Sequence, residues 1–378
     1  MRFETTAVHS GMEVDPETGA VAPPIHLSTT YERTPAGEPS HGFSYVRDGN
    51  PTQTRLETAL AAIDSAEASL VFASGMAAGA ALLQALPRGT HVFFPDDCYY
   101  GFRRLATTSL ERWGITYSIV PMDDLEFVDA VLASSRQTAD AVLWAETPSN
   151  PLLKIVDLDG LALVARKHGA RLVVDGTFAT PALQRPLELG ADVVLHSTTK
   201  YLGGHSDVQG GSLAFRVRDQ WHDEVLEIRE TLGAVSSPFN SWLVLRGIRT
   251  LAARMRVHCD NAEAVAAFLA SHPRVDSVHY PGRPDHPGHD IAQRQMSRFG
   301  GILSFRVRGT REDTLAVTGR TRLFVRATSL GGVESLIEHR HSSEGEGSTT
   351  PENLLRLSIG LEHPDDLIAD LAGALAGS

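Results

Sequence analysis

Short apolar runs alternate with amphipathic segments along the chain from residue 51 onward. Between several runs the apolar positions follow a helical spacing, as in residues 158–168, where Leu161, Val164 and Ala165 share one face. Strands that alternate with helices are typical of a mostly parallel sheet covered on both sides. The pattern therefore predicts an α/β domain. Its expected strands are residues 91–94, 115–120, 141–145, 171–174 and 192–195.

The pattern changes at both ends of this region. Residues 1–50 are rich in Pro, Gly, Ser and Thr and show little periodicity, which predicts an extended arm that contacts a neighbouring subunit. Residues 51–235 form the predicted large domain. Residues 236–378 form a smaller C-terminal α+β domain, with one long helix at 242–269, strands at 301–307 and 354–359, and a final helix from Pro364.

Composition narrows the possible partners and location. The 378 residues carry a formal net charge of −12 that is spread along the chain, without the dense Lys and Arg runs of a nucleic-acid-binding surface. Neither a signal peptide nor a membrane-spanning apolar segment is evident, so we expect a soluble cytoplasmic protein.

The two cysteines, Cys98 and Cys259, form neither a zinc pattern nor a disulfide framework. Cys98 is either a reactive thiol or a buried filler.

Two polar side chains follow directly after predicted strands. Asp175 ends the run Arg171-Leu-Val-Val-Asp, and Lys200 lies in His196-Ser-Thr-Thr-Lys-Tyr-Leu-Gly-Gly. Because ligands bind beyond the carboxyl ends of parallel strands, both should meet at one sheet edge. A lysine that forms a Schiff base and a carboxylate that keeps a pyridine nitrogen protonated are what pyridoxal 5'-phosphate (PLP) requires. A solvated lysine and a turn-capping aspartate are the alternatives.

From about residue 8 to its end, the chain resembles the Cys/Met metabolism family of PLP enzymes. This family includes cystathionine γ-synthase, cystathionine γ-lyase, cystathionine β-lyase and methionine γ-lyase, and it implies the type I fold of PLP-dependent transferases. The ordered set of matching segments is specific. It comprises Pro23-Pro-Ile, Tyr45-Val-Arg47-Asp-Gly-Asn-Pro-Thr52, Phe72-Ala-Ser-Gly-Met76, Glu146-Thr-Pro-Ser-Asn-Pro151, Val174-Asp-Gly-Thr-Phe-Ala-Thr-Pro181, Gly190 to Asp207, Ser329-Leu-Gly-Gly-Val-Glu-Ser-Leu336 and Arg356-Leu-Ser-Ile-Gly-Leu-Glu362.

The resemblance implies how the cofactor is held. Lys200 would bind the PLP aldehyde and then shuttle protons, and Asp175 would partner the ring nitrogen. Tyr45 and Arg47 would bind the phosphate from the adjacent subunit, so the enzyme would be at least a dimer, and the family commonly forms homotetramers. The remaining cofactor-binding residues that the resemblance implies are Gly75, Met76, Tyr99, Asn150, Thr177, Ser197 and Thr199.

Four residues have expected roles on the ring or on the small amino-acid substrate. Tyr99 resembles the aromatic residue that stacks on the pyridine ring and can carry a proton, with Tyr100 as its rival. Asn150 resembles the residue that bonds the ring hydroxyl and touches substrate; otherwise it is a turn former. Arg356 resembles the arginine that grips the substrate α-carboxylate, with Ser329 beside it; a surface ion pair is the alternative.

The implied reaction is γ-replacement or γ-elimination on homoserine-derived amino acids such as cystathionine. Methionine γ-lyase and cystathionine β-lyase are the alternatives, and a non-catalytic protein of the same fold is the different class. Leu330 stands where β-lyases commonly have tryptophan, which favours γ chemistry. Thr328 stands where enzymes acting on cystathionine often carry glutamate, so the distal amino group lacks that partner.

Two further segments contain residue types that are common in functional sites. Residues 339–350 are unlike the family pattern, with Arg340 in place of a common proline. This segment is either an active-site loop that reads the distal end of the substrate or a solvated loop. The histidines at 279, 286 and 289 lie in a Pro/Gly loop without helical spacing or carboxylate support, so no metal site is predicted.

Overall fold

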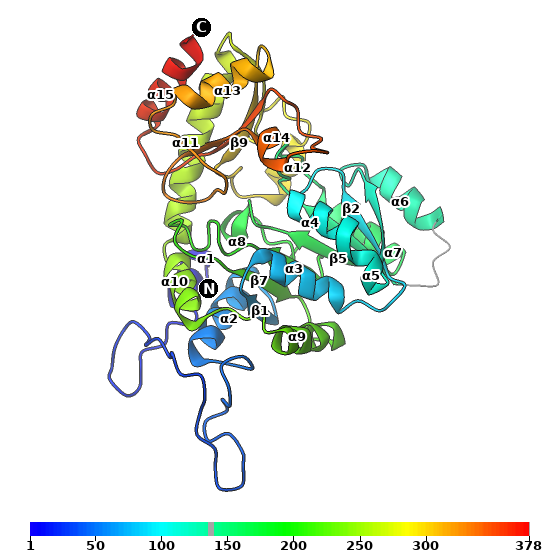
Figure 1. Cartoon of the computed structure of the whole chain (residues 1–378), viewed down its shortest axis with the longest axis vertical. Helices are drawn as coiled ribbons and strands as arrows, with labels where there is room; N and C mark the ends of the chain where they lie inside the picture. Colours follow the sequence, from blue (N-terminus) through cyan, green and yellow to red (C-terminus); the bar gives the residue numbers. More distant parts are fainter. Residues whose placement is uncertain (135–139, 378) are drawn as a thin grey trace.

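The large lobe is built around a seven-stranded sheet whose strands follow the order β1-β7-β6-β5-β4-β2-β3. The structure is a computed structural model that describes residues 1–134 and 140–377. Figure 1 shows this lobe beside a smaller one. The seven strands are β1 (Ala68–Phe72), β2 (His91–Pro95), β3 (Thr116–Val120), β4 (Ala141–Glu146), β5 (Arg171–Asp175), β6 (Val193–His196) and β7 (Gly211–Phe215).

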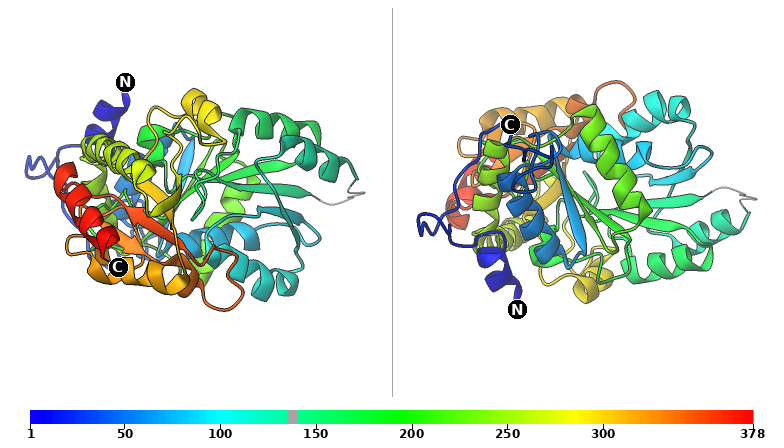
Figure 2. Two further views of the ribbon diagram at one scale, coloured as in Figure 1. Left: turned by 90° about the horizontal axis from the view of Figure 1, so that it is seen from above. Right: turned by 90° about the horizontal axis from the view of Figure 1, so that it is seen from below.

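Helices cover both faces of this sheet (Figure 2). Strands β2 to β6 pair in parallel, whereas β7 runs antiparallel to both β6 and β1. The parallel sheet was predicted, but β1 and β7 were not. The helices around it are α2 (Pro51–Asp64), α3 (Gly75–Gln84), α4 (Tyr100–Leu105), the π-helical turn η1 (Ala106–Leu110), α5 (Glu111–Trp113), α6 (Leu125–Ser134), α7 (Leu158–Lys167), α8 (Thr180–Leu183) and α9 (Gln220–Leu232).

Side chains on the central strands point alternately to the two faces of the sheet, and each face has its own apolar core. Val173 faces a core that includes Trp144 and helix α3, whereas Leu172 and Val174 face a core that includes helix α7. Side chains on a strand point alternately to opposite faces, and a strand buried on both faces is therefore apolar throughout. This explains why β5 reads as a continuous apolar run before Asp175.

Neighbouring strands β5 and β6 end at the same edge of the sheet, as predicted. They pair in parallel, with Asp175 opposite Leu195. Lys200 follows β6 by four residues, in a turn in which the Gly203 amide bonds the Thr198 carbonyl at 2.9 Å. Asp175 and the Ser197–Lys200 segment therefore emerge side by side.

The smaller lobe contains a five-stranded sheet of order β10-β11-β12-β9-β8. All of its pairs are antiparallel except β10 with β11. Its core packs that sheet against α11, α13 and α15. Its elements are α11 (Leu251–Ser271), β8 (Val275–His279), α12 (His289–Gln295), β9 (Ile302–Val307), α13 (Arg311–Arg320), β10 (Val325–Arg326), β11 (Leu336–Glu338), α14 (Arg340–Glu344), β12 (Leu354–Ser358) and α15 (Pro364–Ala376).

The single helix predicted over 242–269 is wrong, because the structure has two helices there, α10 (Pro238–Ile248) and α11. The Gly247 carbonyl is taken by the Arg254 guanidinium at 2.8 Å and by the Thr250 amide at 3.2 Å. A Cβ on Gly247 would lie 2.4 Å from the Gly203 carbonyl oxygen. The glycine thus lets the end of α10 dock against the turn after Lys200.

The N-terminal segment is not extended throughout. Residues Phe3–His9 form helix α1, which packs against α2 and α11 and buries Ala7. Between α1 and α2 the chain forms long loops that reach away from both lobes (Figure 1). No helix in the described part of the chain is long and apolar enough to cross a bilayer.

Candidate active site

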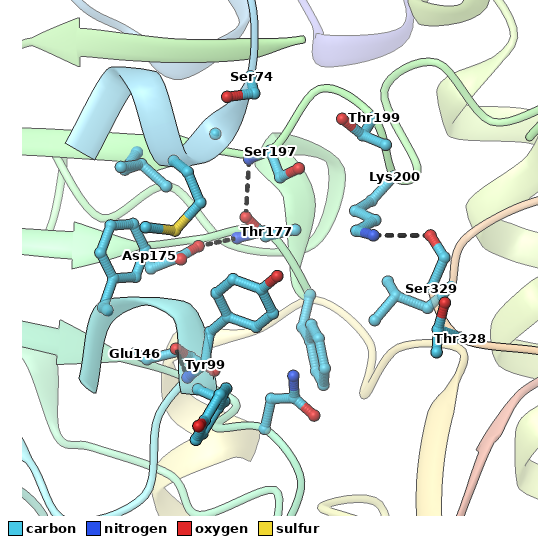
Figure 3. A pocket seen from close by; sticks show the side chains of 18 of the residues that line it. Ser74, Tyr99, Glu146, Asp175, Thr177, Ser197, Thr199, Lys200, Thr328 and Ser329 are labelled. Carbon is cyan, nitrogen blue, oxygen red and sulfur yellow. Dashed lines mark hydrogen bonds between the residues drawn. The ribbon is translucent and has the colours of Figure 1, made fainter. Parts of the chain in front are cut away.

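A cavity of about 390 Å³ lies between the two lobes. Its large-lobe walls come from the start of α3, the start of α4 and the carboxyl ends of β4, β5 and β6, and its small-lobe walls come from residues 328–330, α14 and β12. Figure 3 shows the side chains that converge there. Of the predicted site residues, the structure brings together Gly75, Met76, Tyr99, Asn150, Asp175, Thr177, Ser197, Thr199, Lys200, Ser329 and Arg356.

Lys200 reaches across the cavity from the large lobe to the small lobe. Its Nζ donates a hydrogen bond to Ser329 Oγ at 2.6 Å (Figure 3). Burial lowers the pKa of the Lys200 amine to about 8, and the positive charges of Arg356 and Arg340 act in the same direction. A substantial fraction of the amine is therefore neutral near physiological pH, as a nucleophile and proton acceptor must be.

Two buried carboxylates form the floor of the cavity. Asp175 accepts a hydrogen bond from the Thr177 amide at 3.0 Å, and Glu146, opposite it on β4, accepts one from the Tyr99 amide at 2.7 Å. Burial raises the pKa of Asp175, and burial together with the charge of Asp175 raises the pKa of Glu146 well above its usual value. A cation in the cavity would offset the cost of ionising these carboxyls. A protonated pyridine ring satisfies this requirement.

The N-terminus of α3 provides a place for an anion. Ser74 caps the helix by accepting a hydrogen bond from the Ala77 amide at 3.1 Å, and Gly75 and Met76 begin it. A Cβ on Gly75 would lie 3.0 Å from the Cβ of Ser197, so glycine keeps this corner open. Helix N-termini favour phosphate through their unpaired amides and their dipole.

Two hydroxyls fix the turn beside this corner. Thr177 Oγ1 accepts a hydrogen bond from the Ser197 amide at 2.9 Å, which ties the ends of β5 and β6 together. Thr199 Oγ1 exchanges hydrogen bonds of 3.1 Å with the backbone of Gly210. The anion corner, the acidic floor and the lysine together fit the phosphate, the ring nitrogen and the aldehyde of PLP. Ser197 and the α3 amides would hold the phosphate, and Asp175 the ring nitrogen.

Tyr99 lies at the start of α4, with its backbone held by Glu146. Its ring is 6.2 Å from that of Phe102, in an edge-on arrangement. A Cβ on Gly101 would lie 2.5 Å from the Tyr99 ring and 2.8 Å from Met76 Sδ, so glycine makes room for the ring. Tyr100 also lines the cavity, and the choice of Tyr99 for ring stacking stays a prediction.

Arg356 contacts the other two residues that are predicted to bind the substrate, Asn150 and Ser329. It is buried in β12, and its Nη atoms donate to Asn150 Oδ1 at 3.0 Å, to the Ser329 carbonyl at 2.7 Å and to Glu338. Its Nε has no hydrogen-bond partner among the described residues. Burial lowers the pKa of Arg356 to about 10, so it remains a cation at neutral pH. Asn150, Ser329 and Arg356 thus form one group that can receive a carboxylate.

Tyr45 and Arg47 do not line the cavity of their own chain. They lie in the exposed segment before α2, where the Arg47 guanidinium is 5.5 Å from the centre of the Tyr45 ring. That these two residues bind the PLP phosphate in the site of a neighbouring subunit stays a prediction.

Glu146 had no predicted role, whereas residues 339–350 were expected to be either an active-site loop or a solvated loop; both contribute to the lining of the cavity. Glu146 ends a strand just as Asp175 does, and this shared position is the signal that identifies it. In the 339–350 segment, Arg340, Ser343 and Glu344 reach the cavity from α14. By contrast, His339 bonds Ser342 and the Glu352 carbonyl.

Cys98 is buried, and burial raises the pKa of its thiol well above the usual value. A thiol that stays protonated is a poor nucleophile. Of the two interpretations of Cys98, this environment favours the buried filler.

Comparison with known proteins supports the same cofactor. The family model described as Cys/Met metabolism PLP-dependent enzyme matches residues 4–376. Cystathionine gamma-synthase of Mycobacterium tuberculosis is 47% identical, over 98% of this chain and 96% of the relative. Cystathionine beta-lyase of Coxiella burnetii is 43% identical, over 99% and 97%. The crystal structure of metB from Corynebacterium glutamicum superposes with a TM-score of 0.95 at 42% identity, over 99% and 98%.

The family match covers every residue of the described site, and its description names the PLP cofactor. The two relatives are both named for reactions of cystathionine, but one is a synthase and the other a lyase. The protein is accordingly a PLP-dependent enzyme of sulfur amino-acid metabolism that acts on small amino-acid substrates. Its chain belongs to the Cys/Met metabolism family of PLP-dependent enzymes.

Proposed function

We propose that this enzyme acts at the γ-carbon of homoserine-derived amino acids such as cystathionine, as a cystathionine γ-synthase or γ-lyase. The observation that carries the proposal is the double contact of Ser329. Its hydroxyl accepts from Lys200 at 2.6 Å, and its carbonyl accepts from Arg356 at 2.7 Å. A substrate held by its α-carboxylate at Arg356 therefore presents its α-carbon near the lysine amine.

Some residues of the chain would bind the cofactor, and Lys200 would transfer protons. When bound, PLP supplies the electron sink that stabilises negative charge on the substrate's α-carbon. Asp175 would hold its ring nitrogen and Tyr99 its ring face. Lys200 would accept the α-proton and deliver protons along the substrate side chain, which suits an amine whose pKa is lowered to about 8. After loss of the γ-substituent, a thiol would add in the replacement reaction, whereas in the elimination reaction hydrolysis by water would give a keto acid and ammonia.

Leu330 supports γ over β chemistry. It is buried and packs in the core that joins the lobes, beside the Ser329 contacts. The resemblance places a tryptophan at this position in β-lyases. Methionine γ-lyase is the second candidate, since Thr328 offers no carboxylate to a distal amino group, although Gly101 and Phe102 depart from the Gly-Cys-Thr of those enzymes.

Incubating the PLP-loaded protein with L-cystathionine and identifying the products by mass spectrometry tests this proposal. We expect 2-oxobutyrate and cysteine, which places the bond cleavage at Cγ. Pyruvate with homocysteine would instead make the protein a β-lyase. If no keto acid forms, adding cysteine to an O-acyl-homoserine should yield cystathionine, as a γ-synthase requires. The Lys200→Ala variant, loaded with the same cofactor, is the control for spontaneous PLP chemistry.

The proposal extends to assembly and location. Because Tyr45 and Arg47 lie outside their own chain's cavity, we expect each site to be completed by a second copy, in at least a dimer and, by the family resemblance, a homotetramer. The cytoplasm is the compartment in which a transsulfuration enzyme meets its substrates. Sedimentation at several protein concentrations measures the assembly.

A further inference from the structure

Four buried charged residues form one connected group along β11, α14 and β12. Glu338 bonds Arg356 through one carboxylate oxygen and Arg340 through the other, the latter at 3.1 Å. Arg340 continues to Glu344 at 2.9 Å. Each side chain in the group is at most 8% exposed. Two guanidinium groups and two carboxylates give the group no net charge.

The two ends of this group differ in what they offer to a ligand. Arg356, with Asn150 and Ser329, is the end that receives the α-carboxylate. At the other end, Arg340 and Glu344 also line the cavity, so this end presents one cation and one anion to a ligand. Arg340 Nε is buried without a hydrogen-bond partner among the described residues. A buried guanidinium donor left unpaired is costly, and a ligand acceptor would relieve that cost.

The loop after α14 holds this second end in place. Glu344 accepts hydrogen bonds from Ser348 at 2.6 Å and from Thr350 at 2.9 Å. Thr349, between these two residues, accepts a hydrogen bond of 2.8 Å from Arg103 on α4 of the large lobe. The α14 segment is therefore fixed to both lobes. Thr328, on the neighbouring wall of the cavity, is neutral and does not duplicate the charge of Glu344.

We propose that Arg340 and Glu344 form a subsite for the far end of a substrate that terminates in a second amino-acid group, with Glu344 binding its ammonium and Arg340 its carboxylate. The inference rests on the proposed function, since it places the α-amino-acid end at Arg356. A zwitterion matches this subsite because it adds one charge of each sign and preserves the neutrality of the group. An apolar far end, as in methionine, would leave both charges facing it without a partner.

A structural role for the same residues predicts a different result. If Arg340 and Glu344 only brace α14, replacing either one would weaken every ligand to a similar extent. The test must therefore compare two ligands that differ only at the far end. L-Cystathionine and S-(2-carboxyethyl)-L-homocysteine meet this requirement, since the second lacks only the distal amino group.

The experiment measures both dissociation constants by calorimetry, using protein saturated with PLP and carrying Lys200→Ala to prevent turnover. We expect this protein to prefer cystathionine by about 10-fold or more, the usual effect of one charge-assisted hydrogen bond. Adding Glu344→Gln should reduce the preference to within about 2-fold, because Gln keeps the size of the side chain and loses its charge. Glu346→Gln, an exposed change on the same segment, should leave the preference intact.

The outcomes separate this inference from the proposed function. If both ligands bind and Glu344→Gln leaves their ratio unchanged, the subsite assignment is wrong and the proposed function stands. If Glu344→Gln weakens both equally, the role of Glu344 is structural. Binding of neither ligand to the PLP-saturated protein would overturn the subsite and the proposed substrate class together. Because the readout is a ratio of affinities, a general loss of stability cannot imitate the expected result.

Discussion

Lys200 and Ser329 are joined by a 2.6 Å hydrogen bond that crosses from one lobe to the other. Lys200 lies just beyond β6 of the large lobe, and Ser329 precedes β11 in the small lobe. The same serine holds Arg356 through its carbonyl. The position of the catalytic amine is thus set by the element that also positions the substrate carboxylate.

Ser329→Ala should lower kcat about 10-fold, because the amine loses the hydroxyl that orients it toward the substrate. The KM for the amino acid should change less than about 2-fold, since the main-chain contact with Arg356 remains. Steady-state kinetics on L-cystathionine measure both values. Ser343→Ala, which lines the same cavity, is the matched control. A fall in kcat/KM caused entirely by KM would contradict this role.

The rate at which PLP attaches covalently to the apoprotein should rise with pH and level off near pH 8. Only the deprotonated amine attacks an aldehyde, and burial lowers the pKa of Lys200 from its usual 10.5 to about 8. Below pH 8 the rate should fall about tenfold per pH unit. Stopped-flow absorbance at a series of pH values follows the reaction. A rate still rising at pH 10 would show that the amine has an ordinary pKa.

Glu338→Gln should destabilise the protein by about 3 kcal/mol or more. It leaves Arg340 and Arg356 buried with one carboxylate fewer between them, and an unpaired buried charge is expensive. The same change should lower the pKa of Lys200 further, because the charge of Glu338 raises it.

Urea unfolding of the apoprotein measures the free energy of unfolding for this variant. Exposed Glu346→Gln provides the baseline and should lie within about 0.5 kcal/mol of the parent protein. If the two variants were equally stable, the buried ion pairs around Glu338 would not contribute as described.

Arg47→Ala should weaken PLP retention about 10-fold or more, through loss of a charge-assisted contact to the phosphate of a neighbouring site. Equilibrium dialysis followed by absorbance of the bound cofactor measures this. Arg33→Ala is a suitable control, since Arg33 donates to the Gly37 carbonyl at 2.8 Å within the same arm. Equal retention by both variants would remove Arg47 from the cofactor site.

The positions of Asp175 and Lys200 could be predicted from the sequence because strand polarity dictates them. Any residue directly after β5 or β6 must emerge at the same edge of a parallel sheet, whatever the rest of the chain does. The edge strand β1 and the antiparallel β7 were missed, because their short apolar runs, Ala68–Phe72 and Gly211–Phe215, have no periodicity that separates them from turns.

The depth of α14 in the cavity could not be predicted in the same way. Arg340 and Glu344 lie in a polar segment with Gly and Ser, whose composition fits a solvated loop as well as an active-site loop. Their burial depends on Glu338 and Arg356, which come from two other strands, and on Arg103 in the other lobe. Likewise, the end of helix α10 near Gly247 depends on a contact with the turn at Gly203. The local helical pattern holds no information about a contact between segments so far apart in the chain.

Because the cavity lies between the two lobes, a bound substrate contacts both of them and holds them together. A ligand held at Arg356 in β12 while its reacting carbon lies beside Lys200 connects elements 156 residues apart in the chain. Heat or denaturant that separates the lobes must first release it. A saturating substrate analogue should therefore raise the melting temperature of the PLP-loaded enzyme above that of the same enzyme without the analogue, because the analogue binds only when the two lobes lie together.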